Sequence, residues 1–474
     1  MIKNNFAKTK IVCTIGPVSE SKDMLTKLTK AGMNVMRLNF SHGTYEEHER
    51  KIKLMTEVNE ELNTKVAIML DTQGPEIRTG FFENGEAVFK KGQKVVLVPD
   101  NILGTSACFS VTYKKLYRDV KPGGKILLYD GKITLEIESV EEDNIICKCL
   151  NAGTITDRRI INVLGVKLGM NFLSEKDIED IKFGCQQPIN FIAASYTRRA
   201  QDIFDIKKLL IQNNRNDIHV IAKIENNEGL DNLDEILNVA DGVMVIRGDL
   251  GIEVPDEDVP FIQKEIIRKC KESGKVVITA TQMLDSMQVN PRPTRAEVSD
   301  VANAIFDGTD ALMLSGESAH GKYPEEAVRT MHSIAYKIEQ SLDYDSLHAK
   351  AMKSAKKNTS EAICMSVAEI AIQFNVAAIV TFTHTGLTAR SMSRYSTKAK
   401  IIAITPKEHT AKQLSLHWGI LPVISPTIKE RNSMIDYAKI VAKEHGVQEG
   451  EIILVTGGNN GIGGDTSFLE LILI

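Results

Sequence analysis

Residues 219–280 read HVIAKIENNEGLDNLDEILNVADGVMVIRGDLGIEVPDEDVPFIQKEIIRKCKESGKVVITA, and this pattern sets the expected architecture. Three short apolar runs lie within it, at His219–Ile224, Gly242–Arg247 and Val276–Ala280. Longer segments with the helical spacing of apolar residues separate the runs. Nearly continuous hydrophobicity is typical of parallel strands that are covered on both faces, so these residues predict a repeated strand–helix unit.

The same alternation continues toward both ends of the chain. Five more runs of this character lie at Lys10–Ile15, Asn34–Asn39, Val66–Asp71, Ile189–Ser195 and Ala311–Leu314. Eight strand–helix units are the number that closes a (β/α)8 TIM barrel, a fold of about 250 residues. The count therefore predicts an α/β protein with a closed barrel rather than an open sheet.

Two regions depart from this repeat. Residues 76–169 lack long helical periodicity and contain short apolar runs between glycine turns, which predicts an inserted β-rich lid domain with a barrel fold. Strand and helix candidates alternate again over 345–474, where we expect a C-terminal α/β effector and assembly domain. The catalytic barrel is then expected over 1–75 and 170–344.

The composition is that of an ordinary globular protein. Among 474 residues, 58 Lys and Arg against 62 Asp and Glu give a net charge of -4, and 43% of the residues are hydrophobic. These values argue against a disordered chain and against a strongly basic nucleic-acid binder. No apolar run approaches a membrane span of about 18 residues. The seven scattered cysteines include no C-x-x-C pair, so we expect reduced thiols and a cytoplasmic location.

Polar residues gather where the predicted strands end, which is the active face of such a barrel. Glu225 and Asp249 follow two neighbouring strands, and their hard carboxylate oxygens suit Mg²⁺. Lys223 lies two residues before Glu225, so both side chains are on one side of an extended strand. A lysine beside a metal can neutralise charge in a phosphoryl or enolate transition state, and a buried ion pair is the structural alternative.

Other strand ends offer ligands for anions and for a second cation. Arg37 and Arg78 can present forked donors to phosphate oxygens, although surface arginines look the same in a sequence. A second set of residues offers oxygen ligands with one formal charge, a combination that suits a weakly bound monovalent cation rather than a transition metal. These residues are Asn39, Ser41, Asp71 and Thr72. Singly, these residues are ordinary turn formers, and their agreement across several strand ends is what indicates a site.

Longer motifs make the pattern specific. They are NVMRLNFSHG at 34–43, DTQGPEIRTG at 71–80, IAKIENNEG at 221–229, MVIRGDLGIE at 244–253, TATQMLDS at 279–286 and PRPTRAEVSDVAN at 291–303. With these motifs in this order, the chain closely resembles the pyruvate kinase family. The resemblance begins near Lys10, is weaker through the inserted region and is weakest toward the C-terminus.

The resemblance implies transfer of the phosphoryl group of phosphoenolpyruvate to ADP, which yields pyruvate and ATP in glycolysis. It places Mg²⁺, or Mn²⁺, on Glu225 and Asp249, and K⁺ on Asn39, Ser41, Asp71 and Thr72. The implied phosphoenolpyruvate contacts are Arg37, Lys223, Gly248, Asp249 and Thr281. The implied nucleotide contacts are Asn39, Phe40, Ser41, His42 and Arg78. Such chemistry needs little covalent participation by the protein and much positioning and neutralisation of charge.

The resemblance also implies individual catalytic roles. Lys223 would stabilise the transition state, and Arg37 and Arg78 would hold the substrate and the transferring phosphate. Thr281, through a water molecule, would relay a proton to the enolate that remains after transfer. A threonine hydroxyl is a poor acid, so the source of that proton stays open.

Three positions near the nucleotide and potassium sites distinguish this chain within the family. Gln73 stands where relatives commonly carry lysine. The segment LGVKLG at 164–169 replaces a typical KGVNLPG, so the family's nucleotide lysine is Leu164 here, and Lys167 is the candidate to substitute for it. Glu76 is the residue that potassium-dependent relatives tend to carry, where potassium-independent ones have lysine. We therefore predict that activity depends on K⁺.

The C-terminal region resembles the effector domain of the family. Thr383, Thr385, Gly386 and Thr388 lie between a predicted strand and a predicted helix, where hydroxyls and helix amides could cradle a phosphorylated effector. An ordinary helix cap is the alternative. A second, glycine-rich loop near 457–464 lacks the tryptophan and arginine of some sugar-bisphosphate-sensitive relatives, so the effector stays open. Family members are usually homotetramers, and we expect the same assembly.

Two other functions fit part of the pattern. A magnesium-dependent barrel lyase or aldolase acting on an oxo-acid would share the acidic metal pair and the enolate chemistry but would not need ADP. A non-catalytic metabolite sensor on this scaffold would be marked by loss of Lys223, Glu225 or Asp249, and all three are present.

Overall fold

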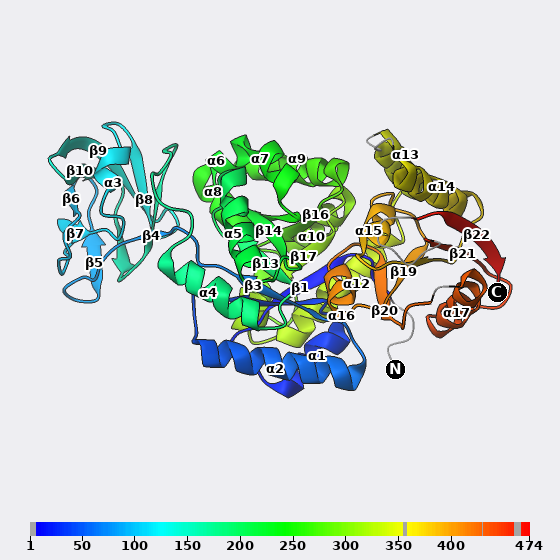
Figure 1. Ribbon diagram of the computed structural model, residues 1–474. Coiled ribbons are helices and arrows are strands. Elements are labelled where there is room, and N and C mark those ends of the chain that lie inside the picture. Colours follow the sequence, from blue (N-terminus) through cyan, green and yellow to red (C-terminus); the bar gives the residue numbers. More distant parts are fainter. Residues whose placement is uncertain (1–5, 354–357, 429, 459–465) are drawn as a thin grey trace.

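A computed structural model describes residues 6–353, 358–428, 430–458 and 466–474. Figure 1 shows three bodies in a row: a β-rich body at one end, a strand–helix barrel in the middle and a second α/β body at the other end. The C-terminal body contains the end of the chain. In the described residues, no helix has the length and apolar character needed to cross a membrane.

The central body is the predicted closed barrel. Its parallel strands pair in the cyclic order β1, β17, β16, β15, β14, β13, β3, β2. Their bounds are Lys10–Thr14 (β1), Val35–Asn39 (β2), Ala67–Asp71 (β3), Phe191–Ala194 (β13), His219–Ile224 (β14), Gly242–Ile246 (β15), Val276–Ala280 (β16) and Ala311–Leu314 (β17).

Helices surround this barrel. They are Lys22–Ala31 (α1), Tyr45–Leu62 (α2), Glu175–Gln186 (α4), Ala200–Gln212 (α5), Asn227–Asp231 (α6), Leu233–Val239 (α7), Arg247–Glu253 (α8), Val259–Ser273 (α9), Arg295–Asp307 (α10), Gly316–Ala319 (α11) and Pro324–Glu339 (α12), with short 3-10 turns at Asp256–Asp258 and Asp285–Gln288. Capping boxes begin several of them, including the Thr294 and Glu297 pair at the start of α10.

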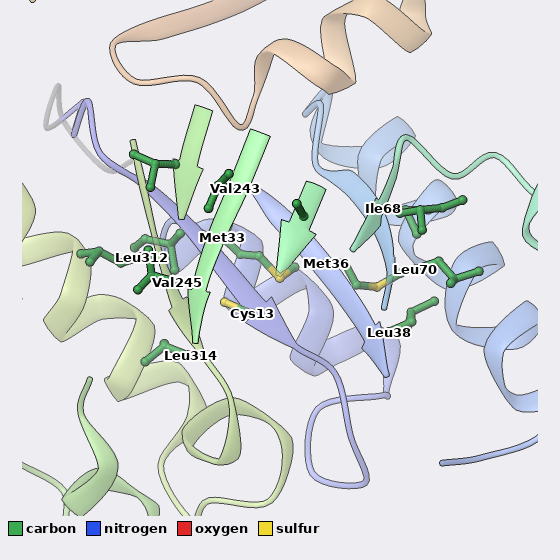
Figure 2. Close-up of a cluster of buried hydrophobic side chains, with 14 of the residues drawn as sticks. Cys13, Met33, Met36, Leu38, Ile68, Leu70, Val243, Val245, Leu312 and Leu314 are labelled. Atoms are coloured by element: carbon green, nitrogen blue, oxygen red, sulfur yellow. The ribbon is translucent and has the colours of Figure 1, made fainter. Parts of the chain in front are cut away.

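The barrel strands are apolar on both faces because both faces are buried. Val12 of β1 packs inside the barrel with Met69 and Met244, whereas its neighbour Cys13 packs in the layer between strands and helices. Figure 2 shows this outer layer, where Leu312 and Leu314 also lie. Since a strand alternates its side chains between two faces, burying both removes any polar alternation.

The inserted body has its own hydrophobic core and is built mostly of short strands. One sheet has the order β4, β12, β8, β9, β10, β6, β7, and β5 pairs with β11 in a second sheet. An isolated bridge between Thr79 and Val111 links the two edges of the larger sheet, beside β4 and β7. The elements are Ile77–Arg78 (β4), Glu86–Phe89 (β5), Lys94–Val98 (β6), Cys108–Ser110 (β7), Leu116–Asp119 (α3), Lys125–Leu128 (β8), Ile133–Glu141 (β9), Asn144–Cys149 (β10), Gly153–Thr156 (β11) and Ile160–Val163 (β12).

The C-terminal body is a five-stranded sheet with helices. The strand order is β20, β19, β18, β21, β22, and only β22 is antiparallel to its neighbour. The elements are Tyr344–Lys353 (α13), Thr359–Gln373 (α14), Ala378–Phe382 (β18), Leu387–Ser393 (α15), Lys400–Thr405 (β19), Glu408–Leu414 (α16), Ile420–Ile424 (β20), Arg431–Glu444 (α17), Ile452–Gly457 (β21) and Phe468–Leu473 (β22). Most of the glycine-rich loop near 457–464 lies outside the described residues.

The expected fold class is therefore confirmed, and the observed strands differ from the expected ones mainly at their ends. The run expected at Ile189–Ser195 forms a ladder only from Phe191 to Ala194. Asn190 explains the late start, because its side-chain oxygen accepts a hydrogen bond from the Ile68 amide at 2.9 Å. The exact domain boundaries remain predictions.

Candidate active site

The candidate site lies at the carboxyl ends of β2, β3, β14, β15 and β16. Asp71 is the buried centre of a group of charged and polar side chains drawn from three of these strand ends. Its Oδ2 accepts a hydrogen bond from Arg37 Nε at 2.5 Å, and its Oδ1 lies 3.0 Å from Lys223 Nζ. Arg37 Nη1 also donates to Thr14 Oγ1 at 2.8 Å, which fixes the plane of the guanidinium group.

The charges in this group support one another. Burial alone would raise the pKa of Asp71, but Arg37 and Lys223 together outweigh burial and lower it. Burial alone would lower the pKa of Lys223, but Asp71 and then Glu225 outweigh it and raise that pKa. The Lys223 ammonium therefore stays charged at neutral pH.

Glu225 and Asp249 lie beside this lysine. Glu225 Oε1 is 3.2 Å from Lys223 Nζ, and Glu225 Oε2 accepts a hydrogen bond from the Tyr196 amide at 2.5 Å. Tyr196 has a φ of 54°, a left-handed backbone conformation. The pKa of Glu225 is raised by burial, against the opposing effect of Lys223. Burial, and next the charge of Glu225, raises the pKa of Asp249 to about 7.

This pair of carboxylates fits a divalent cation. Glu225 is buried and Asp249 is half-buried, and two neighbouring carboxyl groups with raised pKa values gain from a positive ion between them. Within the described ranges, no three His, Cys, Asp or Glu side chains form a metal-binding group. Two protein carboxylates suit Mg²⁺, because this ion usually keeps the remaining positions for water and substrate oxygens.

Thr281 follows β16 in a strained position. Its φ is 70°, which is rare for a β-branched residue. Its Oγ1 accepts a hydrogen bond from the Gly248 amide at 2.9 Å and donates to the Ala280 carbonyl at 2.6 Å. Arg247 supports the loop, since its Nη2 donates to the Thr281 carbonyl at 2.7 Å.

A cleft of about 760 Å³ opens beside these residues. Gly248, Asp249 and Thr281 line it from the barrel, and Asp130 and Gly131 line it from the inserted body. The turn between β8 and β9 therefore borders the same cleft as the predicted substrate residues.

The four residues expected to bind a monovalent cation lie on adjacent strands or just after them. Asn39 and Asp71 are direct neighbours in the β2–β3 pair. Asn39 Oδ1 accepts a hydrogen bond from the Ser41 amide at 3.1 Å. Thr72 Oγ1 accepts one from the Ser195 amide at 3.1 Å and donates to the Ala193 carbonyl at 3.3 Å.

The residues expected at the nucleotide are more dispersed. Phe40 is buried and stacks on His48 with ring centroids 4.0 Å apart, whereas His42 is exposed. Arg78 pairs with Glu76, its Nε and Nη2 lying 2.8 and 2.5 Å from Glu76 Oε2. In the described residues, no hydrogen bond or ion pair joins Arg78 to the Asp71 group.

Glu76 and Lys167 line a separate cavity of about 180 Å³ at the junction of the barrel and the inserted body. Lys167 is exposed, and Leu164, which occupies the position of the family's lysine, is not among the residues that line this cavity.

The expected effector loop is held largely by its own contacts. Thr383 Oγ1 accepts a hydrogen bond from the Gly386 amide at 3.0 Å, and the Thr388 hydroxyl lies 2.7 Å from that of Thr466. Thr385 is exposed. Gly386 has a φ of 78° and precedes α15, as a turn residue at this place requires.

Sequence reasoning did not single out Ser195. Its Oγ accepts a hydrogen bond from Lys223 Nζ at 2.7 Å, lies 3.1 Å from Asp71 Oδ1 and donates to the Thr72 carbonyl at 2.5 Å. Its position could have indicated this role, because Ser195 is the last residue of one of the eight predicted strands and functional residues are expected at the strand ends. The backbone turn at Tyr196 that brings its amide to Glu225 has no comparable signal.

Two family models match nearly the whole chain. The model of the pyruvate kinase barrel domain matches residues 6–328, and that of the pyruvate kinase alpha/beta domain matches residues 361–472. The chain belongs to the pyruvate kinase family. It is accordingly a phosphotransferase, and the family to which it belongs uses Mg²⁺ and K⁺.

Individual pyruvate kinases are similar over almost the same length. A pyruvate kinase of Staphylococcus saprophyticus is 49% identical over 471 residues, which cover 98% of this chain and 80% of the relative. One of Geobacillus stearothermophilus is 51% identical over 454 residues, covering 95% of this chain and 77% of that protein. The crystal structure of a pyruvate kinase from Cryptosporidium parvum superposes with a TM-score of 0.94 at 37% identity, over 98% of this chain and 96% of that one.

Proposed function

We propose that the protein transfers the phosphoryl group of phosphoenolpyruvate to ADP, which produces pyruvate and ATP in glycolysis. The observation that carries this proposal is the buried Lys223 ammonium, held between Asp71 and Glu225 at 3.0 and 3.2 Å. A fixed positive charge at the strand ends is what a transferring phosphoryl group requires, because its charge spreads over the equatorial oxygens in the transition state.

Glu225 and Asp249 would hold the divalent ion. When bound, Mg²⁺ or Mn²⁺ would supply charge neutralisation and a template for substrate oxygens. The Tyr196 amide holds one oxygen of Glu225, and this contact orients the carboxylate.

Phosphoenolpyruvate would occupy the cleft that Gly248, Asp249 and Thr281 line, with Arg37 and Lys223 on its other side. Arg37 is held by Asp71 and Thr14, so its orientation is set before substrate binds. Lys223 would neutralise the negative charge of the phosphoryl group during transfer and afterwards that of the enolate oxygen. Thr281, held by the Gly248 amide, would position the water that delivers a proton to carbon.

The nucleotide would bind near Asn39, Phe40, Ser41, His42 and Arg78, with Lys167 as the candidate for the missing lysine at position 164.

Changing Lys167 to Met should raise the KM for ADP while leaving the KM for phosphoenolpyruvate unchanged. Lys322, an exposed lysine on the barrel, is a matched control. An unaltered KM for ADP in the Lys167→Met enzyme would remove Lys167 from the proposal.

Asn39, Ser41, Asp71 and Thr72 would bind K⁺, and Glu76 leads us to propose that the enzyme needs it. Its turnover should fall strongly in potassium-free buffer balanced with tetramethylammonium, and added K⁺ should restore it. Undiminished turnover without potassium would contradict this role.

We also propose a cytoplasmic homotetramer whose C-terminal domain responds to a phosphorylated effector through Thr383, Thr385, Gly386 and Thr388. The inserted body, whose β8–β9 turn borders the cleft, would act as a lid over bound substrates.

A coupled assay of pyruvate formation tests the proposed activity. Product should require phosphoenolpyruvate, ADP, Mg²⁺ and K⁺ together, and Lys223→Met should abolish turnover while Lys322→Met keeps it. Product without ADP would indicate a lyase. No product under any condition would indicate a metabolite sensor.

A further inference from the structure

Two linkers join the inserted body to the barrel. The outgoing linker, residues 72–76, runs from β3 to β4, and the returning linker, residues 164–174, runs from β12 to α4. Figure 1 shows the inserted body set off to one side of the barrel, at the end of these linkers. Asp177 of α4 ties them together, because its Oδ1 accepts a hydrogen bond from the Gly74 amide and its Oδ2 accepts one from the Ser174 amide, each at 3.1 Å.

Both linkers contact the loop after β13, residues 195–198, which we call the β13 loop. Arg198 holds the returning linker, since its Nη1 and Nη2 donate to the Leu168 and Met170 carbonyls, each at 3.1 Å. This arginine is buried, and its own amide donates to Asp202 Oδ2 at 2.9 Å. The guanidinium group therefore attaches the returning linker to the β13 loop.

The outgoing linker packs against the same loop at Gly74. This residue has a φ of 77°, and a Cβ added to it would lie 2.9 Å from the Ser195 carbonyl oxygen and 3.0 Å from Tyr196 Cδ2. These distances are shorter than van der Waals contact, so a side chain here would push the linker and the β13 loop apart. Glycine allows both the backbone conformation and the close approach.

The β13 loop also holds a proposed ligand of the divalent ion. The Tyr196 amide donates a hydrogen bond to Glu225 Oε2 at 2.5 Å. The φ of Tyr196 is 54°, a conformation that is costly for a residue with a side chain and persists only where the surroundings fix it. The close approach of Gly74 and the linker contacts of Arg198 supply such support. Without them the turn should relax and draw its amide away from Glu225.

We propose that Gly74 and Arg198 are positioning residues for Glu225, through which the two linkers of the inserted body maintain the divalent-ion site. This inference rests on the proposed function, in which Glu225 holds the ion. Both residues act through Tyr196: the linkers hold the turn, and the amide of the turn orients the carboxylate. Residues that orient a metal ligand contribute to metal affinity although they do not touch the ion.

Mn²⁺ binding followed by electron paramagnetic resonance tests the outgoing linker. Gly74→Ala would insert a methyl group between the linker and the β13 loop. Gly92→Ala is the matched control, because Gly92 has a φ of 82° and nothing lies within 4 Å of a Cβ added to it. Both variants carry the cost of a left-handed backbone, and only Gly74→Ala crowds the loop. We expect Gly74→Ala to weaken Mn²⁺ affinity by roughly tenfold, as for loss of a hydrogen bond to a charged group, and Gly92→Ala to leave it unchanged.

A second pair of variants tests the returning linker. Arg198→Met removes both donors to the linker, whereas Arg199→Met removes the neighbouring, exposed arginine. Mn²⁺ affinity should fall by roughly tenfold in Arg198→Met, as is typical when a residue that orients a metal ligand is lost, and should stay unchanged in Arg199→Met. Arg198→Lys keeps the charge beside Asp202 but lacks the fork that serves two carbonyls, so it should recover only part of the loss.

The magnesium requirement of the enzyme separates positioning from a general loss of stability. The Mg²⁺ concentration that gives the half-maximal rate should rise in Gly74→Ala and Arg198→Met by about the same factor as the Mn²⁺ dissociation constant. A variant that is only less stable would lose active enzyme at an unchanged Mg²⁺ requirement. Circular dichroism checks the fold of each variant.

The outcomes distinguish this inference from the proposed function. If the parent enzyme binds Mn²⁺ and a folded Gly74→Ala or Arg198→Met enzyme binds it equally well, the positioning role of that residue is wrong and the divalent-ion site stands. Equal losses in Gly74→Ala and Gly92→Ala would also overturn the role of Gly74. If the parent binds no Mn²⁺, the proposed site and this inference fail together. If one of the two variants does not fold, the other decides.

Discussion

Ser195 shows how a neutral residue can organise a charged site. A serine hydroxyl has one hydrogen, and its 2.5 Å contact with the Thr72 carbonyl uses that hydrogen. Its oxygen is then free to accept from Lys223 Nζ at 2.7 Å. The chain Lys223–Ser195–Thr72 thereby connects the proposed transition-state residue to a proposed K⁺ ligand.

Replacement of Ser195 by Ala should therefore misplace the Lys223 ammonium. We expect kcat to fall by roughly tenfold to a hundredfold, since a hydrogen bond to a charged group contributes about 1.5–3 kcal/mol. The KM for phosphoenolpyruvate should change much less than kcat. Steady-state kinetics measure both, with Ser333→Ala on α12 as the control. A Ser195→Ala enzyme with unaltered kcat would contradict this positioning role.

At the scale of elements, the junction between α8 and β12 contains a carboxyl group whose ionised form is disfavoured by burial. Burial is the main reason that the pKa of Glu253, at the end of α8, is raised to about 7, although Asn162 of β12 and Asn227 donate hydrogen bonds to it. In the unfolded chain its pKa would be near 4.5, the ordinary value for a glutamate side chain. The folded state thus binds the proton more tightly than the unfolded state does.

This difference predicts a pH dependence of stability. The contribution of Glu253 is fully present below about pH 4.5 and is lost as pH rises through about 7, up to roughly 3 kcal/mol. Glu253→Gln, which cannot ionise, should therefore gain stability relative to the parent between pH 5 and pH 8. Thermal unfolding followed across this range measures the effect. A Tm difference between the two proteins that stays constant with pH would contradict it.

The elements themselves were largely predictable from the sequence. Strands β14, β16 and β17 have the expected bounds. A strand that is buried on both faces appears in the sequence as a nearly continuous apolar run, which is easy to recognise. The pairing of Arg78 with Glu76 was not predictable, since it depends on how the chain leaves the barrel for the inserted body. The left-handed turns at Tyr196 and Thr281 also depend on tertiary contacts rather than on local sequence preference.

At the scale of the whole molecule, Arg394 connects the C-terminal body to the barrel through a hydrogen bond to the Glu272 carbonyl. Arg394→Met would leave the buried Glu361 carboxylate without its ion pair and remove the contact to the Glu272 carbonyl. We expect stability to fall by about 3 kcal/mol. Adding Glu361→Gln should recover part of the loss, because the uncompensated charge disappears.

Differential scanning calorimetry of both single variants and the double variant measures this coupling. Arg329→Met, on the exposed face of α12, is the control and should change the Tm little. Additive effects in the double variant would show that the two side chains act separately, contrary to the proposed link.

Binding of Mn²⁺ followed by electron paramagnetic resonance tests the divalent-ion site most directly, because it needs no turnover. We predict that the parent enzyme binds the ion, that Glu225→Gln and Asp249→Asn each weaken its affinity by roughly tenfold or more, and that Asp234→Asn on α7 does not. Undiminished affinity in a folded Glu225→Gln or Asp249→Asn enzyme would contradict the account.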